Sequence, residues 1–120
     1  MRYLLLIYGD ESARPEVPPD DPEVALKSWW EYTAWLQEKG WYLGGDALQP
    51  TATATTVRER DGKTLTTDGP FAETKEQLAG YYLIECENLD QAIEAASRIP
   101  AVDQGSIEVR PVMEIPDPPS

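Results

Sequence analysis

The segment from Thr66 to Glu76 holds the densest group of side chains that could do chemistry in this chain. Asp68 at the start of a turn can accept backbone N–H bonds, Gly69 permits a positive φ angle, and Pro70 has a fixed φ angle of its own. Phe71 is expected to anchor the loop in the core. The residue types therefore predict a well-defined turn followed by a polar loop.

Two interpretations of this loop stay open. In the first, the turn holds Asp68, Glu73 and Lys75 around a pocket between subunits, with Asp68 as the candidate general base. In the second, which the residue types alone favour, these side chains are simply solvated. Arg110 on the last expected strand could supply a cation for a carboxylate or phenolate ligand, or it could form a surface pair with Glu108.

The absence of some residue types from the sequence excludes several kinds of catalytic site. The chain contains no histidine, which rules out Ser-His-Asp and Cys-His nucleophiles and an imidazole general base. Cys86 is the only cysteine, and its place at the end of an apolar strand predicts an inert, packed thiol. The pairs Asp10-Glu11 and Asp20-Asp21 match no calcium loop, so a solvated loop and a helix cap are expected there. No metal or other cofactor is predicted.

The strongly negative net charge indicates which classes of binding partner are not expected. The 120 residues include 22 acidic and 10 basic side chains, for a net charge of −12. Such a surface repels phosphate backbones and anionic membranes, so neither nucleic-acid nor membrane binding is expected. The apolar run from Tyr3 to Tyr8 is too short to span a bilayer and predicts a strand. With one cysteine and no recognisable leader, the chain is expected to be cytoplasmic.

The order of the expected elements indicates the fold class. Asp61-Gly62 predicts a tight hairpin turn. Strand, helix, strand hairpin, strand, helix, strand is the ferredoxin-like split β-α-β pattern of an α+β protein, with an added hairpin. One domain is expected over residues 1–115, with a loose tail at 116–120. Strands are expected at 2–8, 41–48, 51–59, 63–67, 78–86 and 107–113, and helices from Pro22 to Gly40 and from Asn88 to Pro100.

Each expected helix has one apolar face. In the first helix Trp35 points away from this face and becomes a candidate contact for a partner protein. The face of the first helix consists of Leu26, Trp29, Thr33 and Leu36, and that of the second of Leu89, Ala92, Ile93, Ala96 and Ile99.

Two helices can cover only one face of such a sheet, yet the strands at 2–8 and 78–86 are apolar on both faces. A bare apolar sheet face is not tolerated by a soluble monomer. A second copy, packed sheet to sheet about a two-fold axis, is the preferred explanation. The alternative is that the loop at 9–21 or the Trp41-Tyr42 segment folds over the second face.

The segment from Asp68 to Glu76, followed by Gly80-Tyr81-Tyr82, resembles the signature of the YCII-related proteins of the DGPF subgroup. The resemblance covers most of residues 1–115. It implies a dimeric α/β-barrel fold in a bacterial protein whose biochemical role is generally unassigned. Relatives are often encoded beside extracytoplasmic-function sigma factors. Further matching segments are Gly44-Gly45 with Leu48 and Pro50, Leu89-Asp90, Ala92-Ile93, Ile99-Pro100 and Ile107 to Val112.

One departure limits what this resemblance implies about chemistry. The wider family is thought to pair an active-site histidine with an aspartate, and a few relatives act on small aromatic compounds. Because this chain has no histidine, that dyad cannot be carried over. Acid–base chemistry would rest on carboxylates, a lysine or a tyrosine. The candidate catalytic residue is therefore Asp68, and the candidate ligand-binding residues are Glu73, Lys75, Tyr82 and Arg110.

Three functions follow as hypotheses. The first is a homodimer that binds a small anionic or aromatic molecule in a pocket beside the Asp68 loop, with cofactor-free lyase or isomerase activity as one form of it. The second is a regulatory or protein-interaction module linked to sigma-factor systems of the extracytoplasmic-function type. The third is a purely structural domain.

Overall fold

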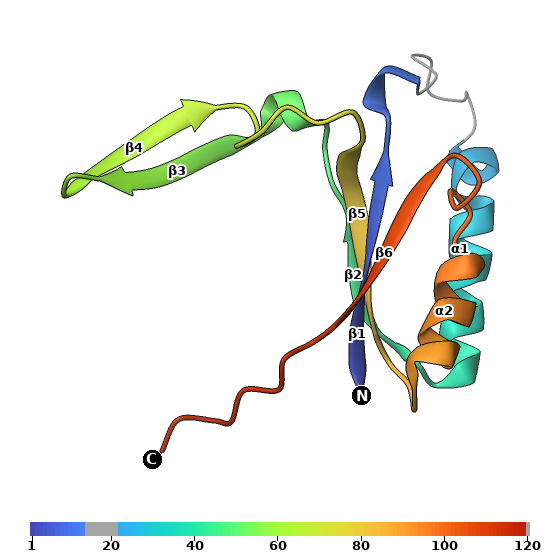
Figure 1. Ribbon diagram of the computed structural model, residues 1–120. Helices are drawn as coiled ribbons and strands as arrows, with labels where there is room; N and C mark the ends of the chain where they lie inside the picture. The colour runs from blue at the N-terminus through green and yellow to red at the C-terminus, as the bar shows by residue number, and fades with distance from the viewer. Residues whose placement is uncertain (14–21, 120) are drawn as a thin grey trace.

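The computed structural model describes residues 1–13 and 22–119 (Figure 1). The cap expected at Asp20 or Asp21, and most of the loop expected at 9–21, lie outside the described residues. Within the described ranges, no helix is both long enough and apolar enough to cross a membrane.

Four strands form an antiparallel sheet in the order β2-β5-β1-β6. This is the strand order of a ferredoxin-like split β-α-β sheet, with a hairpin inserted between β2 and β5. The α+β class expected from the sequence is therefore confirmed. The bounds are β1 (Arg2–Gly9), β2 (Tyr42–Ala47), β5 (Gln77–Glu85) and β6 (Gly105–Pro111).

Both helices, α1 (Pro22–Lys39) and α2 (Leu89–Ser97), lie on the same side of this sheet (Figure 1). Helix α1 ends before Gly40, whose positive φ of 76° suits a glycine at a helix C-terminus, as expected. At the start of α2 the Asn88 carboxamide oxygen accepts a 3.0 Å bond from the Gln91 N–H. The sequence predicted a helix from Asn88 to Pro100, and α2 begins directly after Asn88 but ends earlier, at Ser97.

The core lies between the sheet and the helices. Successive side chains of a strand point to opposite faces, so Tyr3, Leu5 and Ile7 of β1 are buried under the helices. Leu4 and Leu6 point to the other face, which no helix of the described residues covers. The largest side chains that are fully buried are Leu5, Leu36, Ile84 and Ile99.

The helix faces differ from the expected ones at several places. Tyr32 was not part of the apolar face expected for α1, but it is buried. Its hydroxyl donates a 2.7 Å bond to the Ala95 carbonyl of α2. Leu89 and Ile93 were expected inside, but each is 50% exposed. The reason is that Ala92, Ala95 and Ala96 form the buried face of α2 and leave larger neighbours at its rim.

Trp35 was predicted to point away from the core, and this prediction is wrong. Its ring packs against the core beside the rings of Tyr32 and Trp41, with centroid distances of 5.9 Å and 5.7 Å. The Arg98 guanidinium lies 4.5 Å from the centre of the Trp35 ring. Trp35 is therefore a packing residue between α1 and the end of α2.

The inserted hairpin consists of β3 (Thr55–Arg60) and β4 (Lys63–Asp68), joined by Asp61 and Gly62. Both turn residues have positive φ angles, 54° and 75°, which is the two-residue turn that the Asp-Gly pair predicts. The hairpin is a separate two-stranded sheet that projects away from the four-stranded one (Figure 1). Two short 3-10 helices complete the described structure. One, Glu11–Ala13, follows β1, and the other, Thr51–Thr53, lies between β2 and β3.

We expect Tyr32→Phe to lower the free energy of unfolding by about 1 kcal/mol, because it removes a buried hydrogen bond between the two helices. Urea denaturation followed by circular dichroism measures this change. Tyr81→Phe is the matched control, since its hydroxyl bonds to the exposed Asp46 carboxylate, and we expect a loss below ~0.5 kcal/mol. Equal losses in the two variants would contradict the role assigned to Tyr32.

Candidate functional site

A cavity of about 540 Å³ lies between the sheet and α1, a volume typical of a pocket for a small molecule. Each of the four strands contributes a glycine to its floor. Helix α1 supplies Leu26, Trp29 and Thr33 on the opposite side. The floor glycines are Gly9 of β1, Gly45 of β2, Gly80 of β5 and Gly105 of β6.

The cavity exists because the inner face of the sheet changes from large side chains to glycine along its length. Strand pairing aligns Gly80 with Ile7, and Gly105 with Gly9, at the same end of the sheet. Burial along the apolar face of α1 changes in the same direction. Leu36 is fully buried, whereas Leu26 is 42% exposed because it borders the cavity instead of a packed side chain.

Three of the floor glycines lie where a larger residue would collide with a neighbouring strand. A Cβ on Gly45 would lie 2.6 Å from the Tyr81 carbonyl oxygen, and one on Gly80 would lie 2.8 Å from that of Asp46. A Cβ on Gly105 would overlap the carbonyl oxygen of Tyr8. Gly9 differs, because no atom lies within 4 Å of the position its Cβ would take.

Aromatic rings and a few polar groups complete the lining. Trp29, Tyr42 and Tyr82 are all part of it. The Tyr82 and Thr33 hydroxyl oxygens are 3.0 Å apart and hydrogen-bonded. Burial raises the pKa of Tyr82, so its hydroxyl is neutral at physiological pH. The Tyr82 hydroxyl can therefore serve as a neutral hydrogen-bonding group toward a bound molecule.

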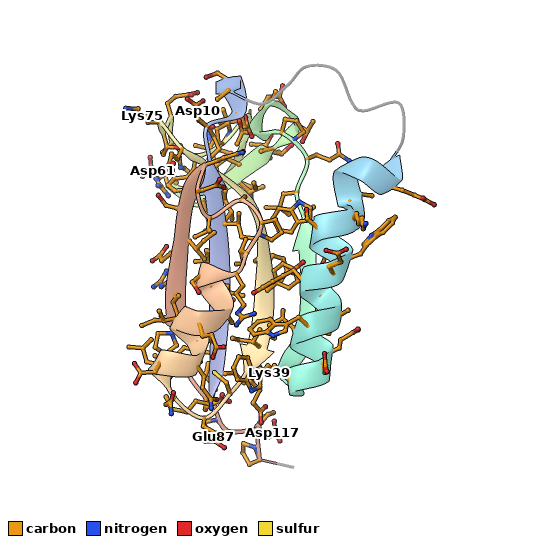
Figure 2. The ribbon with its side chains drawn as sticks, turned by 90° about the vertical axis from the view of Figure 1, so that its right-hand side faces the viewer. Asp10, Lys39, Asp61, Lys75, Glu87 and Asp117 are labelled. Carbon is orange, nitrogen blue, oxygen red and sulfur yellow. The ribbon has the colours of Figure 1, made fainter. Side chains whose placement is uncertain are left out.

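Two acidic side chains, Asp10 and Asp46, are among the described residues of the lining. Hydrogen bonds from Ser12 lower the pKa of Asp10, and the positive charge of Lys75 lowers it further. Figure 2 shows Asp10 and Lys75 at the same end of the molecule. Asp46 accepts a 2.9 Å bond from the Tyr81 hydroxyl. In the described part of the lining there is no lysine or arginine, so the local charge disfavours an anionic guest.

Of the residues that the sequence proposed for a site, only Tyr82 lines this cavity. Asp68 is exposed at the end of β4, where it pairs with Thr55 in the hairpin. Glu73 and Lys75 are exposed in the loop between β4 and β5. The structure therefore does not gather Asp68 and Glu73 with Tyr82 within one chain, and their functional roles stay predictions.

Arg110 and Tyr82 lie on opposite faces of the sheet. Tyr82 pairs with Leu5, which faces the helices, whereas Arg110 pairs with Leu4, which faces away from them. The Arg110 Nε atom is 3.7 Å from a Glu108 carboxylate oxygen, and both side chains are exposed. Glu108 also accepts a 3.3 Å bond from the Tyr8 hydroxyl. Any ligand that Arg110 binds must therefore lie on the face without helices.

The turn at Asp68 differs from its expected form in one respect. Gly69 has the positive φ that was predicted, 100°, and its N–H donates a 2.7 Å bond to the Ala54 carbonyl. Phe71, however, is 78% exposed and does not anchor the loop. The loop is held instead by Thr56, which donates to the Gly69 carbonyl, and by Arg58, which donates to that of Phe71.

Other candidate groups are accounted for by structural roles. Cys86 is buried, and burial raises the pKa of its thiol, which suits an inert side chain. The Glu11 carboxylate accepts bonds from the Thr51 N–H and hydroxyl, so it fixes the segment before the hairpin and is not merely solvated. Among residues 1–13 and 22–119, no three His, Cys, Asp or Glu side chains lie close enough together to hold a metal ion.

Sequence reasoning missed the floor of the cavity. The four glycines are far apart in the chain, and Gly45 was noted only as part of a segment that matches the family. Their common position follows from strand register, which pairs Gly9 with Gly105 and places Gly80 opposite both Ile7 and Ala47. The signal was present as one glycine in or near each of the four expected strands, but only the strand order makes it meaningful.

Comparison with known proteins assigns the chain to a family. The model of the YCII-related domain matches residues 1–116. An uncharacterized protein of Rhizobium meliloti (strain 1021) is 41% identical to the chain over 115 residues, which is 93% of this chain and 92% of that relative. The match spans every strand and helix described above, including the inserted hairpin. The chain belongs to the family of YCII-related domains.

Proposed function

We propose that this chain binds a small, mainly aromatic or apolar molecule in the cavity between the sheet and α1. The observation that carries the proposal is an open space of about 540 Å³ in which glycines replace side chains on one side and aromatic rings border the other. A larger residue at Gly9 would fill part of this space, because no atom lies within 4 Å of the position of its Cβ. Three of the glycines also let the strands approach closely, so they have a structural role as well.

The polar groups of the lining support a guest that is neutral or positively charged. Asp10 and Asp46 are both hydrogen-bond acceptors, and the Tyr82 hydroxyl is neutral. A guest with an aromatic body and a hydrogen-bond donor would match this lining, because its ring would contact Trp29 and its donor a carboxylate. Of the two ligand types expected from the sequence, this favours the aromatic over the anionic one.

A catalytic role stays a separate proposal. Asp68, Glu73, Lys75 and Arg110 do not line the cavity, so lyase or isomerase chemistry at Asp68 would need a different arrangement from the one within a single chain. The assignment to the DGPF subgroup likewise stays a proposal, which rests on the resemblance of Asp68 to Glu76 and Gly80-Tyr81-Tyr82 to the signature of that subgroup. The alternative of a regulatory module rests on the sigma-factor association of relatives, and Trp35, its candidate contact for a partner, packs against the core.

We also propose that two copies pack through the face of the sheet that no helix covers. The solvent-accessible area is 9019 Å², whereas a compact monomer of 13.4 kDa exposes about 6,500 Å². The excess is larger than the ~800 Å² that each partner buries in a standard interface. Leu4, Leu6 and Leu83 give this face an apolar centre, with charged residues such as Glu108 toward its edge.

We expect Gly9→Leu to weaken cavity binding at least ~10-fold, because the new side chain enters open space without striking a neighbour. The neutral aromatic dye N-phenyl-1-naphthylamine serves as the probe, and its fluorescence reports binding. Ala34→Leu is the matched control, since Ala34 is exposed on α1 and does not line the cavity. Circular dichroism verifies that both variants fold. Equal dye affinity in the wild type and both variants would overturn the proposed site.

We expect static light scattering to give a mass near twice 13.4 kDa for the wild type. Leu6→Asp should shift the mass to that of one chain, because it places a charge at the centre of the proposed interface. Leu89→Asp is the control, since this half-exposed residue lies on the helix side and an acidic residue suits the start of a helix. A wild-type mass of 13.4 kDa would refute the dimer.

A further inference from the structure

The β3–β4 hairpin, called the arm below and comprising residues 55–68, bonds to the rest of the described chain at its base, where Thr56 and Arg58 donate to the loop after β4. Its strands pair only with each other, and all its residues except Thr56 are exposed. Val57 is 63% exposed and Leu65 46%. An isolated two-stranded ribbon is marginally stable in water, so an arm of this kind gains order from a partner.

The arm has two faces of different charge. In an antiparallel ribbon, residues directly opposite each other share a face. Arg58 pairs with Leu65 and Arg60 pairs with Lys63, so three cations lie on one face, called the cationic face below. Glu59 lies on the other face, together with Asp68 at the base of the arm.

Among residues 1–13 and 22–119, the cations of this face have no acidic partner. In the part of the chain that the structure describes, none of the three forms a salt bridge. Arg58 donates instead to the Phe71 carbonyl, and Arg60 to the carbonyl of Glu59. Three of the ten basic residues are thus concentrated on one exposed ribbon, in a chain that has 22 acidic residues.

The arm extends from the side of the sheet opposite the helices, which is also the side toward which the C-terminal segment runs (Figure 1). A second copy seated on the open sheet face would therefore lie within reach of the arm. With its net charge of −12, that copy is an acidic partner that is always present. A nucleic acid, by contrast, would be repelled by the rest of the chain.

We propose that the cationic face of the arm binds the acidic surface of a second copy of this chain. In the dimer, the arm of each subunit would then contact the other subunit. This inference rests on the proposed dimer and goes beyond it, because it adds an ionic contact to the apolar one at Leu4 and Leu6. Contacts of this kind are screened by salt, whereas apolar contacts are not.

The test compares two double variants that change the net charge equally. Arg60→Gln with Lys63→Gln removes two cations from the tip of the arm, and Arg58 is kept because it bonds to the loop. Lys27→Gln with Lys39→Gln removes two exposed cations from α1, on the other side of the molecule. Sedimentation equilibrium gives the dimer dissociation constant of each at 50 mM and 500 mM salt.

We expect the arm variant to raise the dissociation constant about 10-fold at low salt, with most of the difference lost at high salt, and the α1 variant to stay within about 2-fold of the wild type. Equal constants in both variants would overturn the arm contact and leave the dimer intact. A monomeric wild type would overturn both. Retention of the wild type, but not the arm variant, on duplex DNA at 50 mM salt would assign the cationic face to nucleic acid and overturn the proposal.

Discussion

The pairing of β1 with β5 is the constraint on which the rest of the structure depends. These two central strands are apolar along most of their length, and their antiparallel register sets Leu5 opposite Tyr82. Because side chains alternate along a strand, this single register decides which apolar residues meet the helices and which face the other way. A shift by one residue would bring Leu4 and Leu6 under the helices and expose the present core.

That register gives the two faces of the sheet different properties. Under the helices, large side chains fill one half of the inner face, and glycines leave the other half open toward Trp29 and Thr33 of α1. The opposite face has an apolar centre, and neither α1 nor α2 lies above it. A cavity for a small molecule and a surface for a second chain can therefore occupy one small sheet without competing for the same residues.

Local sequence patterns predicted the elements well but their packing less well. Turn and cap residues such as Asp61-Gly62 and Asn88 act within a few residues of themselves, so their structures could be predicted. The burial of Tyr32, the packing of Trp35 and the exposure of Phe71 depend on contacts between distant segments, which spacing alone does not specify. The cavity was missed for the same reason, because its floor comes from four separate strands.

An NMR titration of the ¹⁵N-labelled chain with N-phenyl-1-naphthylamine tests the proposed cavity most directly, because glycine amide signals are well separated from others. The account predicts that the signals of Gly9, Gly45, Gly80 and Gly105 move together, while those of Gly62 and Gly69 in and beside the arm stay in place. Movement confined to Gly62 and Gly69, with the four floor glycines unchanged, would contradict it.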